Sequence, residues 1–558
     1  MAFLAASTKE QIMKKLPFFL VLFLCTMTNI YAANPNGNLL FQNVKRNFKE
    51  NSPISFSLFH QTAIRKSSPN SDGINQAVFM DLDAQKLHEL YVSAPTTIEF
   101  IVPNPMGDGN WKLSLYKTEI LAKDFKIKTS DGRTLEAPTA HYYQGVLNND
   151  SNSSAVISVF EHELNGVMSD SSGNYDLGLY GDKVANNYVL YRSNELAAKI
   201  PFECHTDDVN LPAPTAAVVV DCRIVKVYIE CDFDLYTKRG SSITNVNTFV
   251  TGFFNQVASI YTNESIQIQI SEIYVWTSTD PFISLTTSSA ILSAFRTTRT
   301  TFNGNIAHLL STRSSNLGGI AYLDVLCNTG YSHAFSNIYN SYSNFPTYSW
   351  TVNVFTHEMG HNLGSNHTQW CGWTGGALDN CYTTEGGCAA GPAPVGGGTI
   401  MSYCHLVSGV GVNLSNGFGL QPGNKIRLRY SAATCLSGGL TLTISPATAT
   451  ICSGGSIGLT ASGGSTYSWS PTAGLNVSNL ASVTASPTST SSYTVSSTSN
   501  NCTASASRLV TVLSPVNRGT IANSNQAFTT SGDPSLISLS TAASGGNGTF
   551  SYQWYSKT

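Results

Sequence analysis

The stretch from His357 to His367 constrains this chain more than any other part of its sequence. His357 and His361 are four residues apart, so on a helix both imidazoles lie on one face and can bind one metal ion. Glu358 lies at the edge of that face, where its carboxylate can take a proton from water. Gly364 can adopt the left-handed conformation that ends a helix, which lets the chain turn back and bring in His367. Three protein ligands are typical of a catalytic zinc, whereas a structural zinc has four.

Two further features bear on whether this stretch binds a metal. An isolated pair of histidines at this spacing also occurs by chance on a solvated helix face. The glycine and the third histidine at fixed offsets argue against chance. Downstream, the segment 398–404 reads Gly-Thr-Ile-Met-Ser-Tyr-Cys, an apolar run around Met401. A methionine alone is an ordinary core residue, so Met401 matters only in this context.

Together these residues resemble the metzincin peptidases, and more narrowly their reprolysin-like (adamalysin, M12B-type) branch. The resemblance extends over residues 215–436. It implies a zinc metalloendopeptidase with one catalytic Zn²⁺ held by His357, His361 and His367. Glu358 would be the general base, and Met401 would lie in the Met-turn beneath the zinc.

The resemblance also covers a strand before the motif and departs from the branch at one position. The segment Gly319, Ile320, Ala321, Tyr322 resembles the branch's substrate-rim strand, which implies that a substrate binds there as an added β-strand. Thr368 stands where the branch usually has a structural Asp. This departure bears on the assignment to a subfamily more than on catalytic activity.

Tyr403, two residues after Met401, matches a tyrosine of the astacin and serralysin branches that can touch the zinc or the oxyanion. It could stabilise the transition state, or it could be a packed wall residue.

Composition and the N-terminus favour a secreted protein. The 558 residues suggest about three to four domains, and only 12% are charged against a usual ~25%. The net charge of −3 gives no sign of nucleic-acid or anionic-membrane binding. Lys14, Lys15 and the apolar run 16–27 predict a signal peptide over 1–32, although a buried N-terminal helix or a start at Met13 would also fit. No other segment is apolar enough to span a membrane, so we expect a secreted, extracellular or cell-surface protein.

The cysteines are consistent with an oxidising compartment. Of the 12 cysteines, Cys25 would leave with the signal peptide. Cys452 and Cys502 could pair with each other, and the region 215–436 holds enough cysteines for four disulfides, which leaves Cys204 over. These eight are Cys222, Cys231, Cys327, Cys371, Cys381, Cys388, Cys404 and Cys435.

Residues 34–213 are predicted to be a β-rich domain, because short apolar runs alternate with turns. Examples are the runs 97–102, 155–160 and 187–191. Tyr142-Tyr143-Gln144-Gly145, the run 154–160 and Gly166 resemble the reprolysin propeptide pattern, which implies a zymogen. An unrelated β-rich adhesion domain is the alternative.

Cys204 ends this domain, just before a Pro/Ala linker at 211–217. A thiolate is a strong zinc ligand, so Cys204 could occupy the open position and hold the enzyme latent, as in relatives with a cysteine switch. The sequence around it does not match their switch motif. Alternatively, Cys204 forms a disulfide and another cysteine is free.

Residues 214–436 are predicted to be an α/β catalytic domain with a mixed sheet and an active-site helix at about 349–363. The chain after His367 is rich in Gly and Cys and is expected to be irregular. Strands are predicted at 218–230, 266–276, 306–310 and 317–323, the last at the sheet edge, and helices at 290–302 and at about 246–260, the latter amphipathic.

The C-terminal part changes composition abruptly to Ser, Thr, Gly and Ala. Short runs at 440–444, 456–459, 492–495 and 509–513, with Trp469 between two cysteines, predict an immunoglobulin-like β-sandwich over 437–515. A second such unit, incomplete as given, would cover 516–558.

The fold class expected is therefore multidomain: a β-rich propeptide, an α/β metzincin domain and an all-β sandwich tail. Two rival functions remain. In a thermolysin-like peptidase, Glu385 would replace His367 as the third ligand. In a secreted adhesion or binding protein, the metal site would be vestigial. Expected partners are protein or peptide substrates and a cell-surface or matrix contact through the tail, without nucleic acid. Calcium could bind, but no motif shows it.

Overall fold

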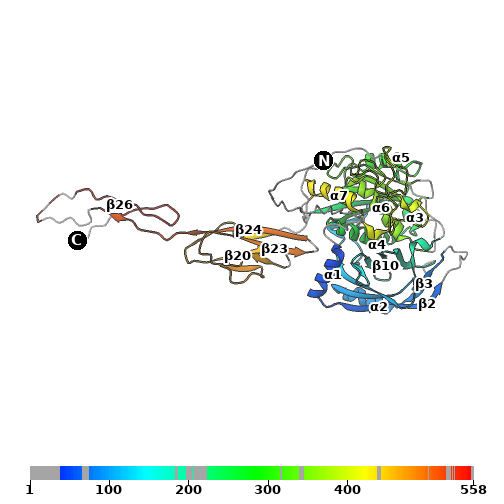
Figure 1. The fold of residues 1–558 in the computed structure, drawn as a ribbon, viewed down its shortest axis with the longest axis horizontal. Helices are drawn as coiled ribbons and strands as arrows, with labels where there is room; N and C mark the ends of the chain where they lie inside the picture. The colour runs from blue at the N-terminus through cyan, green and yellow to red at the C-terminus, as the bar shows by residue number, and fades with distance from the viewer. Residues whose placement is uncertain are drawn as a thin grey trace, which may run out of the picture.

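The computed structural model describes residues 38–553 except for short stretches. These stretches are 66–73, 182–185, 197–203, 205, 207–222, 314–316, 339–344, 437–441, 465, 500–501, 523–528, 531 and 533–534. The predicted signal peptide, Cys25 and Cys222 therefore lie outside the described residues. Two sheets form the body of the molecule, and an all-β tail projects from it (Figure 1). Among the described helices, none is both long and apolar enough to cross a bilayer.

The first part of the chain folds into a ten-stranded sheet with two helices. Its elements are α1 (Leu39–Glu50), β1 (Ile54–Ser57), β2 (Phe59–Arg65), β3 (Ala77–Leu82), α2 (Ala84–Ser93), β4 (Thr97–Pro103), β5 (Asn110–Thr118), β8 (His141–Leu147), β9 (Ser154–Val159), β10 (Leu164–Asp170), β11 (Gly173–Leu179), β12 (Asn187–Arg192) and the 3-10 turn η1 (Ser193–Glu195). The strand order is β1-β4-β5-β8-β9-β10-β11-β12-β3-β2. The predicted runs became β4, β9 and β12. The two helices were not predicted, although Asn38 and Asp83 cap their first turns.

The second sheet has seven strands, and two of them come from the first part of the chain. Its strands are β6 (Leu121–Thr129), β7 (Thr134–Leu135), β13 (Ile224–Cys231), β14 (Gln267–Val275), β15 (Ile306–Ser311), β16 (Gly319–Ala321) and β17 (His333–Asn337). The order is β16-β17-β15-β13-β14-β6-β7, so β16 lies at the edge, as predicted. β6 pairs in parallel with β14. The predicted boundary at 213/214 therefore does not separate the two sheets.

Two long helices lie between the sheets. The helical elements of this region are α3 (Phe233–Lys238), α4 (Ile243–Asn263), α5 (Ser288–Thr298), α6 (Tyr348–Asn362), α7 (Leu420–Ala432), η2 (Cys404–Leu406) and η3 (Leu414–Asn416). Both α4 and α6 contact strands of each sheet. On β13, Val227 and Ile229 join the core around these helices, whereas Tyr228 faces a second core against α5. This alternation is the period of a strand with two covered faces.

The predictions made from the sequence were wrong for two helices of this region. The helix α4 was predicted to be amphipathic, but it is buried on all sides from Phe249 to Tyr261, because the first sheet covers its polar face. The helix α7 was not predicted, since its sequence has no clear apolar period. Tertiary contacts hold it instead, among them the buried ion pair between Arg427 and Glu264. The predicted helices near 290 and 349 are confirmed as α5 and α6.

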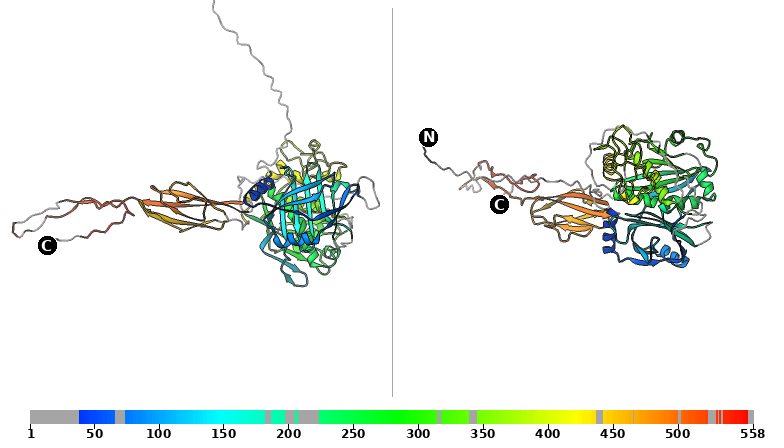
Figure 2. Two further views of the ribbon diagram at one scale, coloured as in Figure 1. Left: turned by 90° about the horizontal axis from the view of Figure 1, so that it is seen from below. Right: turned by 45° about the vertical axis from the view of Figure 1, so that its right-hand side comes forward.

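The tail contains two small sheets that pack around one core. Its strands are β18 (Thr443–Ser445), β19 (Ala449–Cys452), β20 (Ile457–Ser462), β21 (Ser468–Ser470), β22 (Ser482–Ala485), β23 (Ser491–Ser499) and β24 (Cys502–Leu513), followed by β25 (Thr520–Ile521) and β26 (Leu539–Thr541). The sheets are β18-β20-β22 and β19-β24-β23-β21, and Trp469 is buried between them. Figure 2 shows this unit beside the two-sheet body from two further directions.

The disulfides correct part of the cysteine prediction. The bonds join Cys327 to Cys435, Cys371 to Cys388, and Cys381 to Cys404. Cys231 is free and buried, so it takes no part in the four disulfides that its region could have formed. Cys452 is free and exposed, so the predicted bridge to Cys502 is wrong. Cys204 is free and buried, as expected for the leftover cysteine.

Candidate metal centre

The helix α6 places His357 and His361 on one buried face, and the turn after it brings in His367. All three histidines are at most 1% exposed. Gly364 follows the helix with φ +95°, a left-handed conformation that side chains other than glycine rarely adopt. The chain reverses there, and the ring of His367 lies 4.6 Å from that of His361 and 5.3 Å from that of His357, centroid to centroid. The sequence prediction of a helix, a turn and a third converging ring is confirmed.

Each histidine is anchored through its Nδ1 atom. Nδ1 of His357 donates to the carbonyl of Ile400 at 2.8 Å, and Nδ1 of His361 donates to that of Ser365 at 2.7 Å. Nδ1 of His367 faces the Glu385 carboxylate at 3.2 Å. A carbonyl accepts only, so in the first two rings Nδ1 carries the proton and the Nε2 lone pair is available to a metal. Burial lowers the pKa of His357 and His361 well below the usual value, which keeps these rings neutral.

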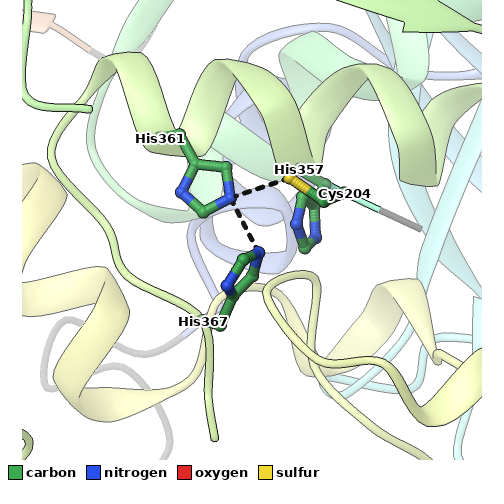
Figure 3. A group of neighbouring side chains, drawn as sticks. All are labelled: Cys204, His357, His361 and His367. Carbon is green, nitrogen blue, oxygen red and sulfur yellow. Dashed lines mark hydrogen bonds between the residues drawn. The ribbon is translucent and has the colours of Figure 1, made fainter. Parts of the chain in front are cut away.

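A fourth potential ligand joins the three histidines. The ligand atoms of Cys204, His357, His361 and His367 all lie within 4.8 Å of one another. The Cys204 sulfur is 3.5 Å from Nε2 of His361, which in turn is 3.1 Å from Nε2 of His367 (Figure 3). Three imidazole nitrogens and a thiol are a donor set that zinc prefers. Because Nδ1 carries the proton in His357 and His361, each of these rings has its lone pair on Nε2, the atom that a cation would bind. The residues present therefore fit a zinc ion.

Glu358 is buried beside this cluster, beneath the edge strand. Its Oε2 atom accepts from the Cys204 thiol at 3.4 Å, and its buried Oε1 atom has no hydrogen-bond partner among the described residues. Burial raises the pKa of Glu358 to about 8, and the Cys204 hydrogen bond and the charge of His367 act in the opposite direction. A β-carbon on Gly319 would come within 2.1 Å of Oε1, so only glycine lets β16 pass over this carboxylate. The sequence placed Gly319 in the rim but did not predict this contact.

The segment that was predicted to be a Met-turn packs against the helix α6. Met401 is fully buried, and its sulfur is 2.7 Å from the position that a β-carbon on Gly360 would take. The backbone carbonyl of Met401 accepts from the Thr368 amide at 3.1 Å. Thr368, which stands in place of the expected Asp, thus links the turn of the third histidine to the Met-turn.

Tyr403 reaches the site through its hydroxyl. The hydroxyl donates to the carbonyl of Cys204 at 2.7 Å and lies 3.4 Å from Nε2 of His367. Burial raises the pKa of Tyr403 far above its usual range, so the phenol stays protonated and can donate a hydrogen bond.

Glu385 contacts the Nδ1 side of the His367 ring, which faces away from the centre of the cluster. Its carboxylate lies at Nδ1 of His367 and accepts from the Gln369 side chain at 2.9 Å. Backbone hydrogen bonds between 369–371 and Glu385, together with the bond between Cys371 and Cys388, hold the loop there. The rival assignment of Glu385 as third ligand is therefore wrong. Sequence analysis missed its contact with His367, for which the only signal was an acidic residue in a cysteine-bounded loop.

The edge strand β16 already has a neighbour on its open side. Cys204 forms a parallel bridge with Gly319, and the Thr206 hydroxyl bonds to both the amide (2.9 Å) and the carbonyl (3.2 Å) of Ala321. A piece of the chain thus lies along the predicted substrate rim. The same piece carries the thiol into the histidine cluster.

The class of protein follows from this fold and site together with its known relatives. Residues 221–410 match the family model of metallo-peptidase family M12. The chain is 26% identical over 152 residues to the snake venom metalloproteinase trimerelysin-2 of Protobothrops flavoviridis, a match that covers 26% of this chain and 73% of that protein.

Two solved structures show more distant likeness. The crystal structure of metalloproteinase-II from Bacteroides fragilis is 14% identical, with a TM-score of 0.32 over 50% of this chain and 85% of that one. A chaperone–substrate complex is 10% identical, with a TM-score of 0.23 over 55% of this chain and 41% of that one.

The metal-binding donor set and the family match define a metallopeptidase. More narrowly, residues 221–410 match a reprolysin-like domain of metallo-peptidase family M12, which indicates a zinc metalloendopeptidase. The rival of a binding protein without enzymatic activity is not supported.

Proposed function

We propose that this protein is a secreted zinc endopeptidase in which His357, His361 and His367 hold one zinc ion and Glu358 is the general base. The observation that carries this proposal is the convergence of three buried imidazoles whose Nδ1 atoms are already engaged. This arrangement leaves each Nε2 atom to bind the metal. Glu358 is adjacent to the cluster without belonging to it.

The chemistry then divides between the metal and the protein. A zinc ion supplies a Lewis acid that polarises the scissile carbonyl and lowers the pKa of a nearby water from about 16 toward ~7. Glu358 accepts the proton of the attacking water and delivers it to the leaving amine. The Tyr403 hydroxyl, now bonded to a backbone carbonyl, can donate instead to the developing oxyanion. Met401 forms the floor beneath the ligands and does not react.

Substrate recognition is proposed to use the rim strand at Gly319, Ile320, Ala321 and Tyr322. The bonds of Thr206 to the amide and the carbonyl of Ala321 support this proposal, because they join a neighbouring residue to the open side of the strand. A peptide substrate would take the same place as an added strand through its own backbone. Backbone recognition tolerates many sequences and leaves side-chain choice to the neighbouring pockets.

Cys204 is proposed to hold the enzyme latent. Its sulfur lies within reach of His361 and Glu358, so it would occupy the position where water must bind. Burial raises the pKa of the Cys204 thiol to about 12, with the Glu358 charge acting in the same direction. A bound cation would reverse this effect, because a coordinated thiol loses its proton. The N-terminal domain, which carries Cys204, would then keep the chain in a zymogen state.

The extracellular location and the role of the tail belong to the same proposal. Disulfides persist in oxidising compartments, and the chain forms bonds at three places in the peptidase region. The relative named above is a venom protein. The two-sheet tail with its buried Trp469 is proposed to be an immunoglobulin-like unit that contacts a cell surface or matrix.

Zinc content separates the roles of His367 and Glu385. We expect His367→Ala to lose stoichiometric zinc, since a ligand is gone. Glu385→Gln should keep zinc but bind it about 10- to 100-fold more weakly, because the substitution weakens the hydrogen bond that orients His367 through its Nδ1 atom. Competition with a chelator of known affinity measures both, with the exposed Glu161→Gln as the matched control. Full zinc affinity in His367→Ala would refute the ligand assignment.

Proteolysis tests the activity itself. The full chain bearing Cys204→Ser, loaded with zinc, should digest denatured casein and gelatin. A chelator should stop the digestion, and added zinc should restore it. Digestion that continues after the metal has been removed would show that the site described here is not responsible.

A further inference from the structure

The N-terminal unit, residues 39–195, contributes directly to the start of the active-site helix. The amide of Ser349 in the first turn of α6 donates to Oδ1 of Asp176 at 2.7 Å, and the Ser349 hydroxyl donates to Oδ2 at 2.6 Å. Asp176 lies on β11 and is buried. The helix's own N-cap residue, Thr347, makes no side-chain cap bond. A carboxylate at a helix N-terminus satisfies free amides and favours the helix dipole. Asp176 therefore caps the N-terminus of α6 from another part of the chain.

The polar face of α4 is satisfied by the same unit. The Asn255 side chain lies 3.1 Å from both the Gln144 amide and the Ser158 hydroxyl, and it also bonds to the carbonyl of Ile157. The Ser158 hydroxyl in turn donates to the carbonyl of Gly252. Buried polar groups cost free energy when they lose their partners. Without the N-terminal unit, α4 would present these groups and its apolar residues to water.

The N-terminal unit also completes the sheet and the core of the peptidase. β6 adds to β14 along the register from Leu121 to Thr129. Phe125 and Ile127 of β6 belong to the same apolar core as Phe253 of α4 and Phe355 of α6. An interface with a continuous core and satisfied buried polar groups resembles a permanent association and not a dissociable one.

We propose that the N-terminal unit stays in the active enzyme as a structural part of it, with Asp176 as a positioning residue for α6. Activation then requires that Cys204 and Thr206 leave the cleft. The described contacts of these two residues include a bridge to Gly319 and the two bonds of Thr206 to Ala321. They also include the Cys204 thiol on Glu358 and His361 and the Tyr403 hydroxyl on the Cys204 carbonyl. This inference rests on the proposed zinc endopeptidase, since it concerns the regulation of the same site.

A cut in the full chain tests whether the unit is retained. A recognition sequence for a specific protease, inserted at 211–217, would be cleaved in the folded zinc-loaded protein, and the two pieces followed by size-exclusion chromatography without denaturant. We expect the pieces to co-elute, and in the Cys204→Ser chain, where no thiol blocks the site, we expect caseinolytic activity in the same peak. Separation of the N-terminal piece from a C-terminal piece that stays folded, zinc-bound and active would overturn the inference. Co-elution with zinc but without activity, even with Cys204→Ser, would instead count against the proposed function.

Substitution of Asp176 tests the cap, with a readout specific to α6. In Asp176→Ala, hydrogen exchange at the first-turn amides of α6 should accelerate roughly 2- to 30-fold, the usual effect of losing a cap. The visible spectrum of the cobalt-substituted protein should also change, because His357 and His361 lie on that helix. Asp176→Asn should restore both in part, since its side-chain oxygen still accepts. Asp81→Ala, an exposed aspartate on the same sheet, is the control. Unchanged exchange and an unchanged cobalt spectrum in Asp176→Ala would overturn the role of Asp176, and the Asn variant permits the test if the Ala variant does not fold.

Discussion

Replacing Glu358 with glutamine is expected to lower kcat for casein by about 100- to 10,000-fold, the usual contribution of a general base. Glutamine has nearly the same shape and can still accept a hydrogen bond, but it cannot take up the proton of the attacking water. The carboxylate is adjacent to the histidine cluster and outside it, so zinc affinity should change little. KM should also change little, because the interaction that is lost belongs to the transition state.

The measurement is best made in the Cys204→Ser chain, where the thiol no longer contacts Glu358. Steady-state rates and zinc content are determined on the same preparation, and Glu161→Gln, an exposed site, serves as the control. If Glu358→Gln lost zinc in parallel with activity, Glu358 would be a determinant of metal binding and not the base. If it kept full activity, proton transfer would have to come from another group.

Replacing Cys204 with serine is expected to activate the uncut chain by about tenfold or more. The thiol sulfur lies 3.5 Å from Nε2 of His361 and 3.4 Å from Glu358, so it keeps water and substrate from both the metal site and the general base. Serine is nearly isosteric, but its hydroxyl is a much weaker zinc ligand than a thiolate. A difference of only about 1.4 kcal/mol in ligand strength changes the open fraction tenfold.

Caseinolysis by the full chain before any cleavage measures this effect. Cys231→Ser is the matched control, because Cys231 is also buried and free but does not belong to the histidine cluster. In the Cys204→Ser chain, the Thr206 hydroxyl still bonds to the backbone of Ala321, where a substrate would bind. Adding Thr206→Ala should therefore raise activity further. If the Cys204→Ser chain had no more caseinolytic activity than the parent chain, latency would not depend on the thiol.

Much of the site could be predicted because its elements are local in sequence. The spacing of His357 and His361 fixes a helix face, and Gly364 fixes the turn, so the third histidine followed from eleven consecutive residues. The edge position of β16 was also predictable from a short apolar run before that helix. Predictions that required knowledge of distant partners were less successful. The polar residues of α4, such as Asn255, looked like a solvent face, but they meet Gln144 and Ser158 from a segment about a hundred residues earlier.

The sequence by itself predicted the candidate chemistry of this protein: three histidines as metal ligands and a glutamate as the group that moves a proton. These assignments rest on residue types at fixed short spacings, where the backbone geometry of a helix and a turn leaves little freedom. The tertiary structure alone decided what surrounds them. It brought Cys204 between the rings, placed Glu385 behind His367, and set Asp176 at the start of α6, because packing two sheets around α4 and α6 joins segments that no local pattern connects.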